Sequence, residues 1–509
     1  MPGTLVTLGP FKGGLATASD PSSIADNELA ACDNWDLDFD GSLINRPPIT
    51  LDTQGPVSNQ NIDLLGYFVD SNTGTSYLLG STDNAVHYLS GGTWTQITTG
   101  FRAAAATQFL DKMWIVAVPG SGSNGGSWVP TGGAGTFTTV ASMPKGMGIV
   151  VYKDRLWIAA GSLESTNGSR LYFSAIADGS TWNGSDFIDV NKGDGQKLID
   201  LYSYSNNLFL FKEDSTYVFS YDSAPTKGTI QPVSKVIGVS DIRCVAQFQT
   251  AIYVYHEGSI FELVNYNYSQ LDITVNLQAD TSLSTSYFRP VAVSIVNNRL
   301  VIRYFEKIYV FNLKLRAWTT WTSAFEPGAW FQVPQSPGSN QPPSFVSSSC
   351  ILNSREVYDL FDGIDVNKSE SFNCYIKTKI YDIDAPGMFK KLYWWGIDVI
   401  AQGTVVVSVT PVVYSVSVTW NDVSTFTWNQ VAVNTWDQPL VLNLAVTENI
   451  GVSGSNVRKF LKAVKAIRFR SVFFEVTLPT TGTTSTSPVK LFKVVPSLAM
   501  KEKVVKMVS

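Results

Sequence analysis

Five stretches of this chain repeat one pattern: TQFLDKMWIVAV (107–118), IVVYKDRLWIAAG (149–161), LYSYSNNLFLFKED (201–214), AQFQTAIYVYHEG (246–258) and VSIVNNRLVIRYFE (293–306). Each stretch is an apolar strand, a turn of two or three residues and a second apolar strand. The turns carry Asp, Asn, Lys or Thr, and Asn and Asp are residues that tight hairpin turns readily accept. The sequence therefore predicts a series of β-hairpins.

The hairpins recur at a nearly constant interval. The residues that open the second strands are 43, 52, 44 and 47 positions apart: Trp114, Trp157, Phe209, Tyr253 and Leu300. An earlier unit fits at Tyr77 and a later one at Val357, and a third strand usually follows each pair. Three or four strands in every 40–50 residues, roughly, is typical of propeller blades. Between about residues 57 and 370 we predict a six- or seven-bladed β-propeller, with seven blades favoured over six.

The regions on either side differ in character. Residues 1–56 do not repeat and are expected to form an N-terminal extension or docking segment, with one short helix near Ser23–Cys32. Residues 371–509 contain alternating or wholly apolar runs separated by Gly, Pro, Asn and Thr. That pattern indicates an antiparallel β-sandwich. The predicted fold class is all-β, a β-propeller followed by a C-terminal β-sandwich.

Composition limits the function. The chain has 509 residues, of which 44% are hydrophobic and 16% charged, and its net charge is −5. An acidic protein is not expected to bind nucleic acid specifically. The sequence has no run of 18 apolar residues, so we expect no membrane span, and its first residues do not read as a secretory signal. We expect synthesis and folding in the cytoplasm.

The charge is unevenly distributed. From Gly451 onward there are eleven Lys and Arg and two acids, a net of +9, while the preceding residues carry 26 basic and 40 acidic side chains, a net of −14. This asymmetry indicates docking on an acidic neighbour or on another copy of the chain. The lysines expected to take part are Lys459, Lys462, Lys490 and Lys493. The alternative is a solvated basic strand face.

Residues suited to metal or acid–base chemistry are sparse. The only histidines, His87 and His256, lie in different predicted blades, which speaks against a triad or a histidine-rich metal site. DLDFDG (36–41) resembles half of a calcium loop, but its twelfth position is Pro47. We interpret it as a strand with a wet acidic face that closes in an Asp-Gly turn. Four cysteines without a CxxC motif favour packed free thiols: Cys32, Cys244, Cys350 and Cys374.

Two further motifs bear on enzymatic chemistry. GSGSNG (120–125) satisfies a dinucleotide pattern, but the next residues, GSWVPTGG, cannot open a helix, so we predict a loop. ADGSTW (177–182) is similar to the Asp-box turn of sialidase-type propellers, which is structural in those proteins. The arginines that could serve such a site have no specific spacing: Arg155, Arg243, Arg299 and Arg303. We assign no catalytic residue, no cofactor site and no metal site, and we expect no enzymatic activity.

Two stretches resemble the propeller-containing tail proteins of bacteriophages, which occur as nozzle, hub or tail-tip components. The first is FKGGLATASDPSSIADNELAACDNWDLDFDGSLINRPP (11–48), similar to that family's opening in its Gly-Gly-Leu, its Asp-Pro, its I-x-D-N-E step and its Arg-Pro. The positions concerned are Gly13, Gly14, Leu15, Asp20, Pro21, Ile24, Asp26, Asn27, Glu28, Asn34, Asp38, Gly41, Arg46 and Pro47. It departs from the family at Ala16, where Asn is usual, and at Pro48, where Gly is usual.

The second stretch, residues 171–221, resembles the family's central blade, in which an Asp…Trp turn, a FIDV strand and a Gly-Asp-Gly lead into the next hairpin. The resemblance implies a structural component of the virion tail that assembles with other tail proteins, as a homo-oligomeric ring or as decoration of one. A rival interpretation is a glycan-binding, receptor-recognising protein at the tail tip. A third, for which the sequence offers less, is a propeller glycosidase.

Overall fold

The computed structural model describes most of the chain: residues 4–5, 7–46, 49–54, 62–90, 93–161, 163–164, 166–271, 292–296, 298–304, 307–322, 344–346, 356–360, 372–381, 390–401, 404–414, 440–441, 445–449, 457–469, 471–479 and 490–500. Helix in these ranges is limited to three short 3-10 turns, η1 (Lys192–Asp194), η2 (Pro225–Lys227) and η3 (Ile242–Cys244). Everything else that is regular is β-strand, so the all-β prediction is confirmed. In the described ranges, no helix has the length and apolar character that crossing a membrane would require.

Six four-stranded antiparallel meanders follow one another between residues 63 and 322. Blades 1 to 3 are β7 (Asp63–Val69), β8 (Ser76–Ser81), β9 (Ala85–Ser90), β10 (Thr93–Thr99); β11 (Ala103–Phe109), β12 (Lys112–Ala117), β13 (Gly126–Val129), β14 (Thr136–Thr139); and β15 (Gly148–Tyr152), β16 (Arg155–Ala159), β17 (Arg170–Phe173), β18 (Phe187–Asp189). Blades 4 to 6 are β19 (Leu198–Tyr204), β20 (Asn207–Lys212), β21 (Thr216–Ser220), β22 (Thr229–Ser234); β23 (Val245–Phe248), β24 (Ala251–His256), β25 (Ser259–Val264), β26 (Asn267–Gln270); and β27 (Ala292–Val296), β28 (Arg299–Tyr304), β29 (Lys307–Asn312), β30 (Ala317–Thr322).

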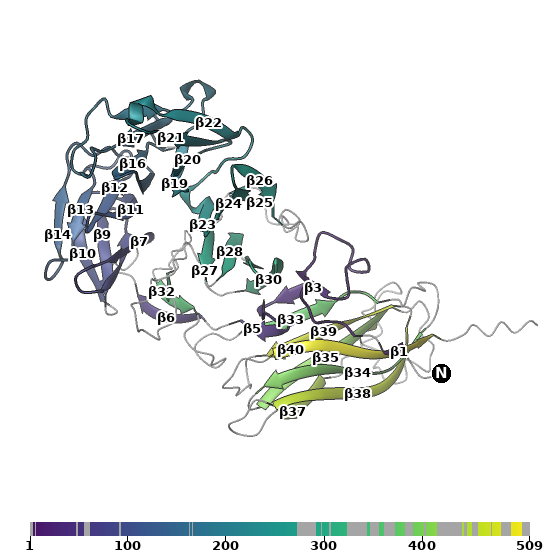
Figure 1. The fold of residues 1–509 in the computed structure, drawn as a ribbon. Coiled ribbons are helices and arrows are strands. Elements are labelled where there is room, and N and C mark those ends of the chain that lie inside the picture. Colours follow the sequence, from purple (N-terminus) through teal and green to yellow (C-terminus); the bar gives the residue numbers. More distant parts are fainter. Residues whose placement is uncertain are drawn as a thin grey trace, which may run out of the picture.

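The meanders are arranged around a ring, and the chain is a β-propeller (Figure 1). Each of the five repeated hairpins forms the first two strands of a blade, as predicted. Some of these turns have two successive residues with positive φ, as in Lys153-Asp154 (46° and 55°) and Ser205-Asn206 (49° and 61°). Such turns match the right-handed twist of the strands that they join.

Repeated tryptophans occupy equivalent places in neighbouring blades. Trp114 and Trp157 each donate their indole N–H to the carbonyl five residues earlier, on Phe109 (3.0 Å) and Tyr152 (2.9 Å). Trp157 is fully buried and its ring lies 5.3 Å from that of Phe219 on blade 4. A blade cannot cover both of its own faces, so these rings supply the apolar contact between one blade and the next.

A strand from the N-terminal region lies among strands that follow the six blades. A three-stranded sheet consists of β31 (Ser344–Val346), β32 (Glu356–Leu360) and β6 (Ile49–Gln54), in that order. The expected extension 1–56 therefore contributes β6 to the unit that we predicted around Val357. Part of that unit lies outside the described residues, so the number of seven blades stays a prediction.

The predicted C-terminal sandwich corresponds to two sheets that share one core. The first sheet has the order β38-β34-β40-β5-β4, with β1 beside β40; the second continues from β30 of blade 6 through β2-β3-β33-β39-β35-β36, with β37 beside β35. Their bounds are β1 (Thr4–Leu5), β2 (Gly14–Leu15), β3 (Glu28–Asp33), β4 (Trp35–Leu37), β5 (Leu43–Asn45), β33 (Asn373–Thr378), β34 (Lys390–Ala401), β35 (Thr404–Tyr414), β36 (Leu440–Val441), β37 (Ala445–Asn449), β38 (Val457–Phe469), β39 (Ser471–Pro479) and β40 (Lys490–Met500). Segments of 415–489 lie outside the described residues, so the complete sandwich stays a prediction.

The N-terminal segment connects the propeller with the C-terminal sheets. Strands β2 and β3 run parallel to β30 of blade 6, and β3 then pairs with β33, while β1 and β5 pair with β40. One apolar core accordingly extends from Trp318 of blade 6 through Cys32 of β3 to Trp395 of β34. This segment is thus an integral part of both regions.

The short helix expected near Ser23–Cys32 is wrong, because Glu28–Asp33 is the strand β3. Only the start of the segment turns locally: Asp20 Oδ1 accepts from the backbone N–H of Ser22 at 2.8 Å, and Glu28 reaches back to the N–H of Ala25 at 2.7 Å. The backbone of β3 instead pairs with strands from distant parts of the chain, a tertiary effect that local propensity does not contain.

Candidate functional site

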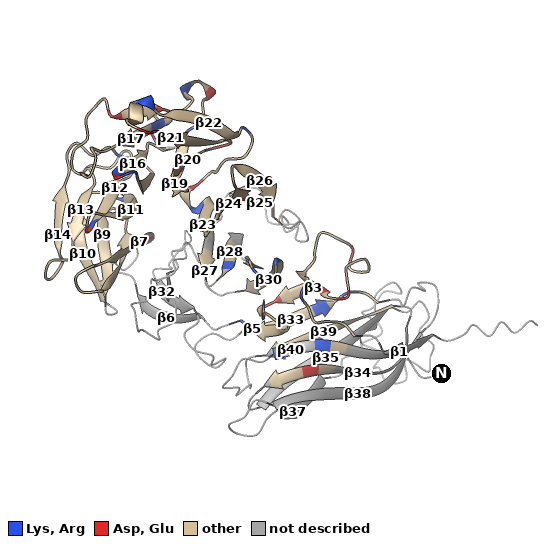
Figure 2. Cartoon of the chain, in the orientation of Figure 1, with Lys and Arg blue, Asp and Glu red and all other residues tan. Residues whose placement is uncertain are grey.

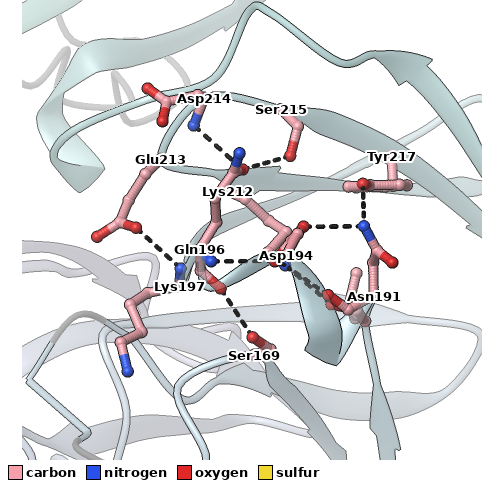
Figure 3. Close-up of polar contacts among 11 residues, drawn as sticks. Ser169, Asn191, Asp194, Gln196, Lys197, Lys212, Glu213, Asp214, Ser215 and Tyr217 are labelled. Carbon is pink, nitrogen blue, oxygen red and sulfur yellow. Dashed lines mark hydrogen bonds and ion pairs between the residues drawn. The ribbon is translucent and has the colours of Figure 1, made fainter.

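The most elaborate polar cluster of the described residues lies between blades 3 and 4 (Figure 3). The side chain of Lys212, at the end of β20, is completely buried and forms an ion pair with Asp194 Oδ1 at 2.6 Å. Its ammonium group also donates to the carbonyls of Val190 (3.0 Å) and Asn191 (3.3 Å). Three acceptors around one ammonium group compensate its loss of hydration.

The same cluster ties the connection between two blades to a hairpin turn. Gln196 accepts from Ser215 at 2.6 Å through its side chain, and its carbonyl accepts from Ser169 at 2.7 Å. Asn191 donates to both Asp194 (2.9 Å) and Tyr217 (2.9 Å). These groups hydrogen-bond to one another, so the cluster holds the loop 190–197 in one conformation. The bonds named here join the loop to β20 and to the turn that follows it.

A second polar cluster lies where the propeller meets the C-terminal sheets. Asn34 has a positive φ of 61° and uses its amide to donate to Thr322 Oγ1 (2.7 Å) and to the carbonyl of Asn373 (2.7 Å). Its side-chain oxygen accepts from Arg46 Nε (2.8 Å) and from the N–H of Thr322 (2.9 Å). The buried Arg46 also donates to the carbonyl of Thr322 (3.0 Å) and lies 3.8 Å from the ring centre of Phe372. One asparagine and one arginine thus join β3, β30 and β33.

The acidic run 36–41 ends in the predicted turn but does not present a wet acidic face. Asp36 is buried and forms an ion pair with Arg299 of blade 6 at 2.5 Å, and Asp38 forms one with Lys490. Asp40 accepts from the N–H of Ser42 at 2.8 Å. Phe39, beside them, is 68% exposed. The prediction of a wet acidic face is wrong for Asp36 and Asp38, because cations from distant strands pair with these two carboxylates.

The motif 177–182 forms a structural turn, as its resemblance to the Asp box implies. Asp178 accepts from the N–H of Ser180 at 2.8 Å, and these hydrogen bonds lower the pKa of the Asp178 carboxyl. The indole of Trp182 is buried and donates to the carbonyl of Gly179 at 2.8 Å. The motif 120–125 is a loop between β12 and β13, also as predicted.

The arginines considered for a sialidase-like site have separate partners. Arg155 donates to the carbonyl of Ser174 (2.6 Å), Arg243 binds Asp241 (2.8 Å) and Arg299 binds Asp36. The side chain of Arg303 lies outside the described residues.

A Tyr–Glu pair of the kind found in sialidases does exist on blade 5, where Tyr253 donates to Glu262 at 2.9 Å. Burial raises the pKa of the Tyr253 phenol, and Glu262 raises it further. Because a phenolic nucleophile must lose its proton, a raised pKa disfavours that role. The pair is better suited to joining β24 to β25.

One histidine and three cysteines are packed in the interior of the described residues. His87 on β9 is buried, and burial lowers the pKa of its imidazole. His256 lies at the end of β24, in another blade. Cys32, Cys244 and Cys374 are buried free thiols, and Cys350 falls outside the described residues. Within the described ranges, no three His, Cys, Asp or Glu residues are grouped so that they could hold a metal ion.

One buried carboxyl was not anticipated from the sequence. Asp200 on β19 is buried, and burial raises the pKa of its carboxyl to about 8. Its Oδ1 accepts from the N–H of Leu201 at 2.8 Å, and the missing side chain of Gly148 on blade 3 leaves room for it. Asp241 adds a like charge that raises the pKa further.

Two of the four lysines expected to dock elsewhere have acidic partners within the chain. Lys490 pairs with Asp38, and Lys493 lies 3.9 Å from Asp398. The side chains of Lys459 and Lys462 are not among those described. On the propeller, the basic and acidic residues that the structure describes are scattered over strands and loops (Figure 2).

Comparisons with known proteins concern the fold. No protein-family model and no curated protein match the sequence. Similar solved structures include the Pan2 WD40 domain of Neurospora crassa (TM-score 0.40, 8% identity, 61% of this chain and 94% of that one) and the AfRom2 CNH domain (0.40, 8%, 62% and 99%). A third is the extracellular domain of the putative one-component system BT4673 of B. thetaiotaomicron (0.41, 10%, 68% and 43%). These similarities are too distant to support an inference about function. The assignment of the propeller rests on the sheets of the chain itself.

Proposed function

We propose that the protein is a structural component of a bacteriophage tail, acting in the nozzle, hub or tail tip. The observation that carries the proposal is the pair of stretches, 11–48 and 171–221, that resemble propeller-containing tail proteins. Each stretch contributes residues to one of the two polar clusters described above. Asn34 and Arg46 join the propeller to the C-terminal sheets, and Asp194 anchors the loop between blades 3 and 4.

This placement suits a rigid building block. Residues of the two family-like stretches hold connections between strands: Asn34, Arg46 and Asp194. A propeller also presents loops that can vary without disturbing its core. In this proposal the protein works by assembly, without a catalytic residue, cofactor or metal.

The proposed partners are other tail proteins of the virion, and the proposed state is a homo-oligomeric ring or a subunit that decorates one. Synthesis takes place in the host cytoplasm and the final location is the virion tail. No sequence-specific nucleic-acid binding and no membrane span belong to this proposal.

The test is to purify particles of the phage that encodes the chain, quantify the protein by mass spectrometry and locate it by cryo-electron microscopy. We expect a fixed copy number per virion and propeller-shaped density in the tail. The proposal fails if gradient-purified, infectious particles lack the protein. In parallel, the purified protein should not hydrolyse sialosides, glucans or peptidoglycan. Turnover that a single carboxylate substitution abolishes would overturn the non-enzymatic part.

Glycan binding gains no specific support from the described surface. Its exposed aromatic side chains are Phe39 and Tyr266. Lys314 lies 4.1 Å from the ring centre of Phe39, and Tyr266 stacks on Phe209 and accepts from Asn207. Phe39 and Tyr266 thus contact different residues and do not contact each other in these interactions. A structural role in the tail is therefore better supported than glycan binding.

A further inference from the structure

Two large apolar side chains are exposed where blades 2 and 3 meet: Leu110 (54%) and Ile176 (63%). Leu110 lies in the turn between β11 and β12, and Ile176 lies in the loop between β17 and β18. The first and the third turn of a four-stranded meander are at the same end of the blade, and blades 2 and 3 are neighbours in the ring (Figure 1). Both side chains are therefore at one end of the propeller, at the seam between these two blades.

Close contacts hold the loop of blade 3 against blade 2. Gly179 of this loop packs so tightly that an added Cβ would lie 2.5 Å from the ring of Trp114. The indole of Trp114 in turn donates to the carbonyl of Phe109, the residue before Leu110, at 3.0 Å. The loop that carries Ile176 therefore lies against the end of blade 2 that carries Leu110.

Leu110 is an unusual residue for its position. It is the first residue of a two-residue hairpin turn and has a positive φ of 50°. Blades 3 and 4 have polar residues at the same place, Lys153 and Ser205. Bulky residues rarely adopt positive φ, and such turns favour Asn or Gly. Neither the backbone nor solvation accounts for an exposed leucine here, and residues held in rare backbone conformations are frequent at functional sites.

Acidic residues lie beside the two apolar side chains. Asp111 follows Leu110 in the turn and is exposed. The backbone carbonyl of Asp154, which is also exposed, accepts from the N–H of Ala177 at 2.7 Å. Because Ala177 follows Ile176, this hydrogen bond places Asp154 close to Ile176. Each apolar residue thus has a carboxylate in its neighbourhood.

The lysines at this end do not offset the acids. Asp178 adds a third carboxylate; hydrogen bonds from Ser180 lower its pKa, and Lys112 of blade 2 lowers that pKa further. The other lysine, Lys153, donates to the carbonyl of Tyr221 and lies 4.8 Å from the centre of that ring. Three acids thus outnumber two lysines across these turns, and the exposed surface between blades 2 and 3 is both apolar and acidic.

We infer that the seam between blades 2 and 3 is a docking site for a basic, aliphatic segment of a partner protein. Aliphatic side chains of the partner remove Leu110 and Ile176 from water, and its lysines or arginines face Asp111 and Asp154. An acidic segment would be repelled by the same carboxylates. The inference does not depend on which particle the protein belongs to.

The probe is a yeast-displayed library of random dodecapeptides, selected on fluorescently labelled full-length protein. A parallel selection uses the variant Leu110→Asn with Ile176→Asn. We expect the natural protein to enrich peptides that combine valine, leucine or isoleucine with lysine or arginine, and the variant not to enrich them. The most enriched peptide is then synthesised, and its affinity for each protein is measured by fluorescence anisotropy at low and high salt.

The single variant Leu110→Asn separates binding from folding. We expect the affinity for the selected peptide to fall about tenfold or more, because a buried leucine contact is lost. The melting temperature should stay equal or rise, because asparagine accepts positive φ more readily than leucine. The matched control is Leu163→Asn, since Leu163 is 57% exposed in the loop between β16 and β17, at the other end of blade 3. It should bind normally.

The charge component is tested with Asp111→Asn and Asp154→Asn together. We expect roughly fivefold weaker binding at low salt and almost no difference at high salt, because the lost attractions are exposed and screened. The control, Asp83→Asn with Asp214→Asn, removes two exposed carboxylates from turns at the other end of the propeller and should bind like the natural protein.

The inference is overturned if the natural protein and the Leu110/Ile176 variant enrich the same peptides, or if neither enriches any. Enrichment of acidic peptides would also overturn it. A clearly lower melting temperature of Leu110→Asn would show that the leucine serves packing, which contradicts the role given to it. None of these results bears on whether the protein is found in virions, so the two proposals can fail separately.

Discussion

Replacing Asp200 by asparagine should stabilise the propeller at neutral and alkaline pH. The carboxyl is buried on β19, and burial raises its pKa from 3.8 to about 8. Below about pH 8 the folded protein therefore keeps a proton on Asp200, whereas the unfolded chain releases it above about pH 4. Between these limits the folded state binds more protons than the unfolded state, so stability falls as pH rises.

The size of the effect follows from the pKa difference. Each pH unit between the two pKa values, 3.8 and about 8, changes the free energy of unfolding by about 1.4 kcal/mol, so the interval is worth roughly 6 kcal/mol at most. Asparagine is similar in shape to the protonated carboxyl and does not titrate. The difference in stability between Asp200→Asn and the natural protein should be small near pH 4 and should grow until about pH 8.

The assay is urea unfolding of both proteins at several pH values from 5 to 9, followed by tryptophan fluorescence. Asp83→Asn is the matched control, because Asp83 is exposed on the turn between β8 and β9 and should change nothing. The nearby groups that could complicate the result are Asp241, which raises the pKa of Asp200, and Tyr202, whose own pKa burial raises. A variant that is destabilised equally at every pH would refute the reasoning, since the carboxyl would then contribute a specific ionic contact.

Two further substitutions test the polar clusters and the close approach of strands, each by urea unfolding. Asp194→Ala leaves the buried ammonium of Lys212 without its carboxylate and should lower the free energy of unfolding by about 3 kcal/mol. Asp189→Ala removes the part-exposed ion pair with Arg170 and should lower it by less than about 1 kcal/mol. Equal losses would show that burial of the ion pair does not matter. Gly14→Ala should destabilise by several kcal/mol more than Gly74→Ala, roughly. Both glycines have positive φ (63° and 69°), but only at Gly14 would a Cβ lie 2.5 Å from a backbone atom, the carbonyl oxygen of Trp318; similar losses would mean that the close packing of β2 against β30 contributes little.

Local pattern sufficed for the propeller hairpins. In 149–161 the apolar runs alternate around Lys153-Asp154, and both strand period and turn chemistry are contained in thirteen adjacent residues. The same holds for the Asp178 turn, whose hydrogen bonds join residues two apart. Where the determining contacts are this close in sequence, the prediction was correct.

Contacts between distant residues were not predictable in this way. Local sequence predicts a helix where β3 lies, because two of the strands that pair with β3, β30 and β33, belong to distant parts of the chain. The sequence predicts Asp36 on a wet face. Asp36 is instead buried, because it pairs with Arg299, which is distant in the sequence. The ion pair between Lys212 and Asp194 was not predicted either, because Lys212 ends an apolar strand and the Gly-Asp-Gly that contains Asp194 was assigned only as a connection into the next hairpin. The buried state of Asp200 likewise depends on Gly148 of another blade.

These long-range contacts have a consequence for folding. The six meanders are built from neighbouring residues, so each can form early with little loss of chain entropy. The N-terminal segment is made first, yet β3 needs β30 and β33, and β6 needs β32. It must therefore wait until nearly the whole chain is available. We therefore expect the propeller and the C-terminal sheets to become joined late in folding, by the segment whose Asn34 and Arg46 carry the hydrogen bonds of that junction.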